Sequence, residues 1–583
     1  MKKRVTMKIV LCLLLCLSLL IVACGQADAP ADPGGGGEAV TADPADVDDD
    51  EDDDADDGAA AGGEVEFGWV NAMENFSVGD TFRAETQMEL SLLFRELPAY
   101  LWDDEWPIVT MLRDKTNVNF AGNTVAVLID DFHHQRQLLI AAGTAPEVMP
   151  VMYGQYVAQF VPGGAMLPFS EYWHHMPHFQ HYMTEWDLWD DLEWSRQADG
   201  HIYHLSGIQE DVALRFTVLL RYDVLRDLGL EVPDTWDEIR DVLRVVAEAF
   251  PGTYPFRDRW DMSSTLNISA RTFGVRFGWG MGNGLILNHD TQEYQFITQM
   301  PELRDFTEFW HSMFAEGLVD PESMTDDEPA WAAFVNGESM MVGGFWQDAP
   351  GFYNDMAENL AAGVEPGPFG IEGAEIVTLP VPNGPTGRVG IARLNNGLIL
   401  NNSIREREDF IAVLQFIDWL YYSEEGREFA IWGVEGETFE WVDDRRQLLP
   451  GFRAVGWGGQ DNEDYQLMSE IGFNQNVFSA THGGSQELTV SIVNDDLRAL
   501  HIANSTRIPH PVNPAPPFDE LEQEQASIIA GQLTDMTNMG VRQFMIGQRD
   551  LAEWDAFVQE VEAAGVDRLV DLANGALQRH LGN

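Results

Sequence analysis

The chain has 583 residues, and its 96 acidic residues outnumber 34 basic ones, which gives a formal net charge of −62. Only 14 of the acidic residues lie between positions 25 and 63, so most of the negative charge belongs to the rest of the chain. A surface this acidic repels nucleic acid and anionic lipid, which argues against both as partners. After the first eight residues Lys115 is the only lysine. This composition is typical of proteins that work outside the cell at high salt or high pH, and a composition bias of the genome would produce it as well.

The N-terminus has the pattern of an export signal. An apolar run at 9–23 follows a basic start made of Lys2, Lys3, Arg4 and Lys8. The run is shorter than the roughly 20 residues of a membrane span, and a short apolar core behind a basic start is typical of a signal peptide. The stretch IVACG at 21–25 resembles a bacterial lipobox, in which Cys24 is lipidated and becomes the first mature residue. The alternative is an ordinary signal peptide with a chance cysteine. Residues 1–23 are therefore predicted to be a lipoprotein signal peptide, and the mature protein is expected on the outer face of the cell membrane, anchored through the lipid.

An acidic and glycine-rich segment occupies positions 24–63. It has essentially no large apolar residue to compensate for the entropy lost on ordering, so it is predicted to be a disordered tether. Nine of the ten residues at 48–57 are acidic, and the run from Asp53 to Glu64 nearly fits the calcium-loop pattern D-x-[DN]-x-[DN]-G-x5-E. Because Ala55 offers no oxygen ligand at the third position, we expect a spacer and no metal site.

Beyond residue 64, short apolar runs alternate with helical patterns. The strand-like runs lie at 88–94, 123–129, 147–152, 216–222, 338–344, 375–381 and 396–402. Helical patterns begin at Asp234, Arg407, Glu520 and Leu551, and Ser423 marks a break with a new cap inside the second of them. Strands that alternate with helices predict an α/β fold with mainly parallel sheets.

The motifs of several enzyme classes are missing from the sequence. Lys115 follows Asp114, so the mature chain has no Gly-Lys pair for a phosphate-binding loop, and neither H-E-x-x-H nor G-x-S-x-G occurs. The three cysteines are Cys12, Cys16 and Cys24, so the mature domain has no thiol nucleophile and no disulfide framework. A pair of catalytic carboxylates, as in a glycoside hydrolase, is neither excluded nor identified among so many acidic residues.

A cluster of four histidines is a candidate metal site. Its members are His174, His175, His178 and His181. Three histidines are enough to bind a transition metal. However, Pro177 is expected at the first position of a helix, which leaves His174 and His175 outside that helix. We therefore expect ordinary histidines here and no metal.

Five segments occur in an order that one protein family shares. RYDVLRDLGLEVPDTWDE at 221–238 fits R-x-D-x-L-x-x-L-G-x-x-x-P-x-T-x-x-E, and FVNGESMMVGGFW at 334–346 fits F-x-x-G-x-x-x-M-x-x-G-x-W. The other three are the DGHIYHL turn at 199–205, the segment YYSEEGREFAIWGVEG at 421–436, and the tail at 516–570 with Trp554. Together they resemble bacterial extracellular solute-binding proteins of family 1, in particular a long lipoprotein subgroup linked to saccharide uptake. Ser206 and Gly207 replace the usual proline, and 457–485 matches weakly, which leaves the ligand's identity open.

The resemblance implies an α/β fold of two lobes, a clamp of the periplasmic-binding-protein (Venus flytrap) type with multiple inter-lobe crossings. It assigns 64–212 and 385–433 to lobe 1, and 213–384 and 434–583, with the C-terminal helices, to lobe 2. The ligand is expected in the cleft between the lobes, which close by a hinge motion. The closed form is then expected to dock on the permease subunits of an ABC transporter. The resemblance further implies a monomer without enzymatic activity and without a cofactor.

Sugars present apolar ring faces and hydroxyl edges, so their sites combine aromatic platforms with a few polar side chains. Loops at the predicted strand ends offer this combination. The residues predicted to bind the ligand are Trp102, Tyr153, Gln155, Trp260, Trp279, Trp346, Asp348, Asn395 and Trp457. Two alternatives remain open: a binding protein of the same fold for a non-sugar solute or for signalling, and a secreted carbohydrate-active enzyme.

Overall fold

The computed structural model describes residues 67–96, 101–129, 131–151, 157–161, 163–197, 199–212, 216–324, 328–389, 393–453, 466–467, 471–473, 478 and 483–581. All of these belong to one compact unit of the chain, Glu64–Asn583. The predicted signal peptide, the lipidation site Cys24 and the tether lie outside the described residues.

The first lobe is built on a six-stranded sheet with the strand order β18-β6-β13-β5-β2-β4. Along β2 (Leu92–Glu96) successive side chains enter different cores, because Leu92 and Phe94 pack on one face of the sheet and Leu93 on the other. A strand that is covered on both faces needs consecutive apolar residues, as this one has. The other elements of this lobe are β1 (Met88–Glu89), α2 (Pro107–Thr116), β3 (Val118–Asn119), β4 (Thr124–Leu128), α3 (Phe132–Ala141), β5 (Val148–Pro150), α4 (Pro177–Glu185), α5 (Trp189–Glu193), β6 (Leu205–Gln209), β13 (Leu394–Leu400), α12 (Phe410–Tyr422), α13 (Glu424–Trp432) and β18 (Gly483–Gly484).

The second lobe is built on a three-stranded sheet with the order β10-β7-β11. Val218 and Leu220 of β7 pack into the largest core, and Leu219 between them packs into a smaller core on the opposite face. The elements of this lobe are β7 (Phe216–Arg221), α6 (Tyr222–Leu228), α7 (Trp236–Ala249), α8 (Ser263–Phe273), β8 (Leu285–Asn288), β9 (Glu293–Phe296), α9 (Pro301–Ala315), α10 (Glu328–Val335), β10 (Met341–Phe345), α11 (Ala349–Ala362) and β11 (Ile376–Thr378).

The expectation of mainly parallel sheets is only half correct. In the six-stranded sheet the pairs β18–β6, β5–β2 and β2–β4 are parallel, whereas β13 runs antiparallel to both of its neighbours, β5 and β6. Both strand pairs of the three-stranded sheet are antiparallel. Only a strand that returns through a helical crossover on the same sheet must be parallel to its predecessor. β13 instead enters its sheet from the other lobe, so its direction was not fixed by such a crossover.

The helix boundaries follow their local signals. Thr235 caps α7: its hydroxyl accepts the Glu238 N–H at 3.1 Å, and the Glu238 carboxylate accepts the Thr235 N–H in return. This reciprocal capping box satisfies two N–H groups that the helix leaves unpaired. Ser423 caps α13 through its hydroxyl alone, which accepts the Gly426 N–H, and so separates α12 from α13 as predicted.

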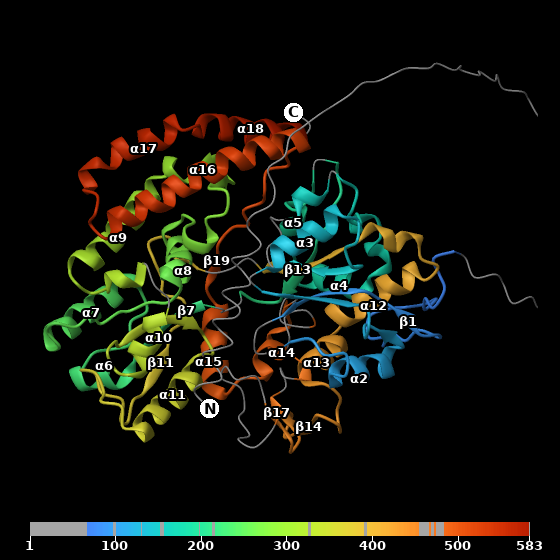
Figure 1. Ribbon diagram of the computed structural model, residues 1–583, viewed down its shortest axis with the longest axis horizontal. Helices are drawn as coiled ribbons and strands as arrows, with labels where there is room; N and C mark the ends of the chain where they lie inside the picture. Colours follow the sequence, from blue (N-terminus) through green and yellow to red (C-terminus); the bar gives the residue numbers. More distant parts are fainter. Residues whose placement is uncertain are drawn as a thin grey trace, which may run out of the picture. The chain divides into compact units, whose positions relative to one another are not determined.

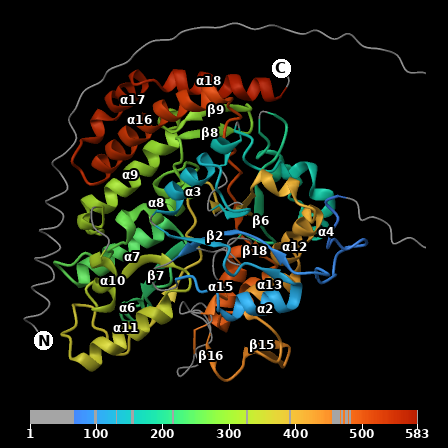
Figure 2. The ribbon, with the colours of Figure 1, turned by 45° about the vertical axis from the view of Figure 1, so that its right-hand side comes forward.

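The C-terminal region forms three helices, where the sequence pattern predicted two. They are α16 (Glu520–Met545), α17 (Trp554–Ala563) and α18 (Val566–His580), and Gly565 with a φ of 126° interrupts the second predicted helix. Figure 1 shows them in red, with α16 next to α9, and Figure 2 shows β8 and β9 close to α18. Their apolar faces extend the largest core of the second lobe. Within the described part of the chain, no helix is both long and apolar enough to cross a membrane.

The chain passes between the two lobes several times, as expected. It leaves the first sheet after β6 and enters the second at β7, returns between β11 and β13, and crosses again after β18 into α14 (Gln486–Ser491) and α15 (Asp495–Ser505). Asn504 of α15 joins two of these crossings. Its side chain is fully buried, accepts the Val381 N–H at 3.2 Å and donates to the Val212 carbonyl oxygen at 3.4 Å.

Candidate functional site: an aromatic platform in the second lobe

Two phenylalanines face each other at one end of the second sheet. Phe216, the first residue of β7, lies opposite Phe345, the last residue of β10, and their ring centroids are 4.7 Å apart. Cross-strand aromatic pairs of this kind stabilise a sheet locally. Because β7 is the first strand after a crossing from the first lobe, the pair lies where the chain enters the second lobe.

Two tryptophans complete this group of rings. The ring of Trp260 lies 5.2 Å from that of Trp279, and both lie within 6 Å of the ring of Phe216, at 5.9 and 5.3 Å. Trp260 also contacts Phe345, at 5.6 Å. We call these four side chains the aromatic platform. Trp279 keeps 41% of its surface exposed, so the platform presents an open apolar face to solvent.

The backbone that carries Trp260 is strained. Trp260, Asp261 and Met262 have φ angles of 52°, 45° and 61°, in the left-handed region that residues with a Cβ avoid. Each such residue costs on the order of 1–3 kcal/mol and persists only where its surroundings hold it. This left-handed turn places the Trp260 ring on the two phenylalanines, and strained backbone of this kind is concentrated at functional sites.

Glycines hold Trp279 close to α8. A Cβ on Gly278 would lie 2.2 Å from the Ser263 carbonyl oxygen, and one on Gly280 would lie 2.1 Å from the Asn267 side-chain oxygen. Gly278 also has a φ of 58°. The loop therefore approaches the first turns of α8 as closely as it does because both residues that flank Trp279 lack a side chain.

An arginine lies between two tryptophans beside the platform. The Arg259 guanidinium carbon is 4.0 Å from the ring centroid of Trp260 and 4.7 Å from that of Trp331 on α10. Its Nη1 donates to Asp348 Oδ2 at 2.8 Å, and the same oxygen accepts the Phe345 N–H at 2.9 Å. Burial raises the pKa of the Asp348 carboxyl, and the charge of Arg259 opposes that rise. Stacking and ion pairing together fix the orientation of Arg259.

A buried carboxyl group ties this loop to the sheet. Asp258 Oδ1 accepts the backbone N–H of Arg259 at 2.9 Å and that of Gly343 on β10 at 2.8 Å. The side chain is 1% exposed, and burial raises its pKa to about 6. Because a Cβ on Gly343 would lie 2.3 Å from this oxygen, the glycine makes room for the carboxyl group.

The structure brings together three of the residues that the sequence pattern predicted, Trp260, Trp279 and Asp348. Trp346 is 6% exposed and packs against His501, with 5.5 Å between the rings. Trp102 belongs to the first lobe, where its ring contacts Phe94, Trp106 and Phe478.

The remaining predicted residues are placed only in part. Asn395 lies on β13, with its backbone opposite Gly207 of β6. Tyr153, Gln155 and Trp457 lie outside the described residues.

Three members of the site were not predicted: Phe216, Phe345 and Arg259. Phe216 had a usable signal, since it is the first aromatic residue after a predicted crossing. Phe345 is adjacent to Trp346, and the prediction chose the tryptophan because its side chain is larger. In the structure Phe345 belongs to the platform, and Trp346 is buried. Arg259 had no signal in the sequence, because its role depends on Asp348 and Trp331, which lie far along the chain.

The histidine cluster serves packing in the first lobe. Pro177 begins α4, as expected, and the buried His178 donates from Nδ1 to Asp418 Oδ2 at 2.9 Å and accepts the Gly79 N–H at Nε2, 3.1 Å away. Both ring nitrogens of His178 are therefore in use. Across the described ranges, no group of three or more His, Cys, Asp or Glu side chains is arranged to hold a metal ion.

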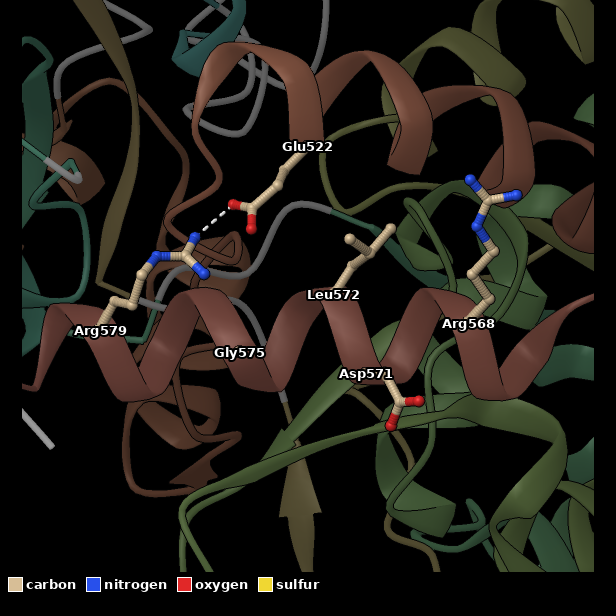
Figure 3. Close-up of a pocket in the computed structure, with 6 residues that line it drawn as sticks. All are labelled: Glu522, Arg568, Asp571, Leu572, Gly575 and Arg579. Atoms are coloured by element: carbon tan, nitrogen blue, oxygen red, sulfur yellow. Dashed lines mark hydrogen bonds and ion pairs between the residues drawn. The ribbon is translucent and has the colours of Figure 1, made fainter.

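A second concavity lies between α16 and α18, with a volume of about 420 Å³ (Figure 3). It is lined by Glu522, Arg568, Asp571, Leu572, Gly575 and Arg579. An ion pair between Glu522 and Arg579 crosses it, and Leu572 is its single large apolar side chain. Since no aromatic ring lines it, it offers no stacking surface for a sugar.

The fold is that of the two-lobed extracellular solute-binding proteins of ABC transporters. The structure is similar to that of the alginate-binding protein AlgQ2, with a TM-score of 0.60 and 16% identity over 85% of this chain and 99% of that one. A human-milk-oligosaccharide (HMO) binding, ABC-transporter-associated solute-binding protein of Bifidobacterium longum infantis gives a TM-score of 0.57 and 18% identity, over 84% of this chain and 99% of that one. FusA of S. pneumoniae in complex with kestose gives a TM-score of 0.55 and 16% identity, over 85% of this chain and 100% of that one.

Sequence comparison finds similarity over a smaller part of the chain than structure comparison does. No protein-family model matches the chain. A stretch of 171 residues, 27% of this chain, is 22% identical to Lipoprotein LipO of Bacillus subtilis (strain 168) and spans 32% of that protein's length.

Proposed function

We propose that this protein is an extracytoplasmic solute-binding protein that captures a saccharide, in particular an oligosaccharide, and delivers it to an ABC importer. The observation that carries the proposal is the aromatic platform, with its exposed Trp279 beside the Arg259–Asp348 ion pair. Apolar sugar faces stack on such rings, while Arg259, which the buried Asp348 orients, donates hydrogen bonds to hydroxyl groups.

The proposal is supported by what the similar structures are described as binding. Their descriptions include alginate-binding, HMO-binding and a complex with kestose, and all three proteins are binding proteins. We therefore take the chain to bind without catalysing a reaction. In this scheme the lobes close on the ligand by rotation about the crossings near Asn504, and the closed monomer docks on permease subunits.

We further propose that the protein is held at the outer face of the membrane by a lipid on Cys24. The lipobox-like stretch at 21–25 and the partial similarity to LipO support this anchoring. Of the predicted ligand contacts, we assign Trp260 and Trp279 to the platform, and Asp348, which is 3% exposed, to the ion pair that orients Arg259 beside it. Trp102, Tyr153, Gln155, Trp346, Asn395 and Trp457 stay predictions.

The test is saccharide binding by the mature domain and by Trp279→Ala. A panel of oligosaccharides, screened by thermal shift and then titrated by calorimetry, should contain at least one sugar that raises the melting temperature saturably. Trp279→Ala should weaken binding of that sugar by about 1.5–3 kcal/mol, which is the energy of burying one large apolar side chain. The unfolding free energy should also fall, because more than half of this side chain is buried, and the fall should be similar in the control described below.

Trp441→Ala is the matched control, because this residue of β14 (Phe439–Val442) is 43% exposed and packs under the Arg446 guanidinium, 4.2 Å away. Equal weakening by the two substitutions, or a panel in which no sugar shifts the melting temperature, would contradict the proposal. Release of reducing ends during long incubation would show a carbohydrate-active enzyme instead.

A further inference from the structure

A side chain of the C-terminal helices reaches the strained turn under Trp260. Arg542, near the end of α16, donates from Nη1 to the Asp261 carbonyl oxygen at 2.7 Å and from Nη2 to Ser263 Oγ at 2.8 Å. Nη2 also lies 3.4 Å from the Asp261 carboxylate. The helix in turn fixes the arginine, since its Nε donates to Asn538 Oδ1 at 2.9 Å. All three guanidinium nitrogens are thus engaged.

These contacts act on the part of the backbone that carries the strain. Asp261 is the middle residue of three left-handed residues, and Ser263 is the first residue of α8. A guanidinium group is a rigid fork of N–H donors, so it fixes the two acceptors relative to each other. The link spans 281 residues of sequence, from Asp261 to Arg542. It therefore joins the turn to an element that carries no residue of the platform.

The two ends of the turn are held by different groups. On the N-terminal side, Asp258 fixes the Arg259 N–H, and the Arg259 carbonyl accepts the Met262 N–H at 2.9 Å. On the C-terminal side, Arg542 binds the Asp261 carbonyl and Ser263. Without the second anchor, the turn would be free to relax toward ordinary backbone angles, and the Trp260 ring would leave Phe216 and Trp279.

We infer that Arg542 is a positioning residue of the ligand site, through which α16 holds the left-handed turn at 260–262 and with it the Trp260 ring of the platform. The inference rests on the proposed function insofar as the platform binds the ligand. It gives the three C-terminal helices a role in ligand affinity as well as in the core of the second lobe.

The first experiment needs no ligand. Two indoles with centroids 5.2 Å apart couple excitonically, so the Trp260–Trp279 pair contributes a couplet to the far-UV circular dichroism spectrum. To isolate the couplet, the spectrum of each protein that also carries Trp279→Phe is subtracted from the spectrum of the same protein with Trp279 intact. We expect Arg542→Gln to lose it. Arg542→Lys should keep part of it, because an ammonium group reaches one acceptor but cannot fork between two.

The second experiment measures affinity for the sugar that binds the wild-type protein. Arg542→Gln should weaken binding about tenfold, as expected when one aromatic contact is lost. Ser263→Ala removes one acceptor of the fork without altering α16, and should weaken both couplet and affinity to a smaller extent. It keeps the test informative if Arg542→Gln does not fold.

Arg568→Gln is the matched control, since this arginine of α18 carries the same charge and its Nη2 bonds only the exposed Gln525, at 3.1 Å, among the described side chains. It should retain the wild-type couplet and affinity. A wild-type couplet in Arg542→Gln, or equal losses in Arg542→Gln and Arg568→Gln, would overturn the inference. If no sugar binds the wild-type protein, the proposed function fails, and the couplet alone decides the role of Arg542.

Discussion

At the candidate site, pH should act mainly through Asp258. Its folded-state pKa of about 6 lies above the ordinary aspartate value of 3.8, because the buried carboxylate loses hydration. The folded state therefore holds this proton more tightly than the unfolded state. The resulting contribution to the free energy of unfolding is about 3 kcal/mol at most. It is fully present below about pH 4 and is lost as the pH rises through about 6.

We expect Asp258→Asn to remove this dependence. An amide keeps the oxygen that accepts the Arg259 and Gly343 N–H groups and does not titrate. Burial lowers the pKa of His204 and His501 to about 4 and that of His510 to about 3, so these histidines raise the stability of the wild type and of Asp258→Asn alike between pH 5 and 7. Over this range the free energy of unfolding of the wild type, measured in urea, should fall relative to that of Asp258→Asn. The exposed Asp227→Asn serves as the control and should follow the wild-type curve. Parallel curves for all three proteins would contradict the assignment.

At the residue scale, the sequence predicted the kind of side chain better than its place. Trp260 and Trp279, which were chosen as tryptophans beside polar residues at strand ends, lie together in the platform. The same pattern selected Trp346, which faces His501 in the core. Which of several tryptophans stays open depends on the path of the backbone, and three consecutive left-handed residues without a glycine give no local signal.

At the scale of elements, the Gly278–Gly280 loop and the start of α8 act as one unit. We expect Gly278→Ala to destabilise the protein by about 1–3 kcal/mol, because its Cβ meets the Ser263 carbonyl and its φ of 58° disfavours alanine. It should also weaken sugar binding, since Trp279 must move with the loop. Chemical denaturation and calorimetry on the same variant measure the two effects.

Gly531→Ala is the control for this loop. Gly531 lies within α16, and a Cβ there meets no atom within 4 Å, so alanine should leave stability unchanged or raise it by roughly 0.5–1 kcal/mol. Unchanged stability and affinity in Gly278→Ala would show that the loop is free to adjust and that its close approach to α8 is not required.

Element types were well predicted, and strand directions only in part. Capping residues and apolar periodicity are local, so α7 and the break at Ser423 could be located from the sequence. The direction of β13 depends on the lobe from which the chain arrives. The third C-terminal helix was missed because Gly565 was not read as an interruption of a helical pattern.

At the scale of the whole molecule, charge is the dominant feature. A net charge of −62 destabilises the compact state through self-repulsion. Salt shortens the range of that repulsion, from a Debye length of about 10 Å at 0.1 M to about 3 Å at 1 M. We expect the melting temperature to rise by several degrees over this range of sodium chloride, since surface ion pairs, which salt also weakens, contribute little.

Potassium chloride at equal ionic strength is the control, because screening depends on ionic strength and not on the cation. A rise with one cation only would indicate a specific binding site, and a fall in melting temperature would show that ion pairs outweigh the repulsion.

The two-lobed architecture itself could be predicted from the sequence, but only through the order of five segments, none of them decisive alone. Composition and periodicity indicated the α/β class and did not indicate the two lobes. The crossings depend on contacts such as those of Asn504, which joins two segments that precede it by 123 and 292 residues. Such contacts leave no mark on local sequence patterns.

The left-handed turn at 260–262 sets stability and binding against each other at a single position. Glycine at position 261 would relieve the unfavourable φ of 45° and should make the ligand-free protein more stable. The same change would remove the carboxylate that faces Arg542 and widen the range of conformations open to the Trp260 ring. Stability gained there would come at the expense of preorganisation, so directed evolution for heat resistance alone should select changes at this turn that lose the ligand.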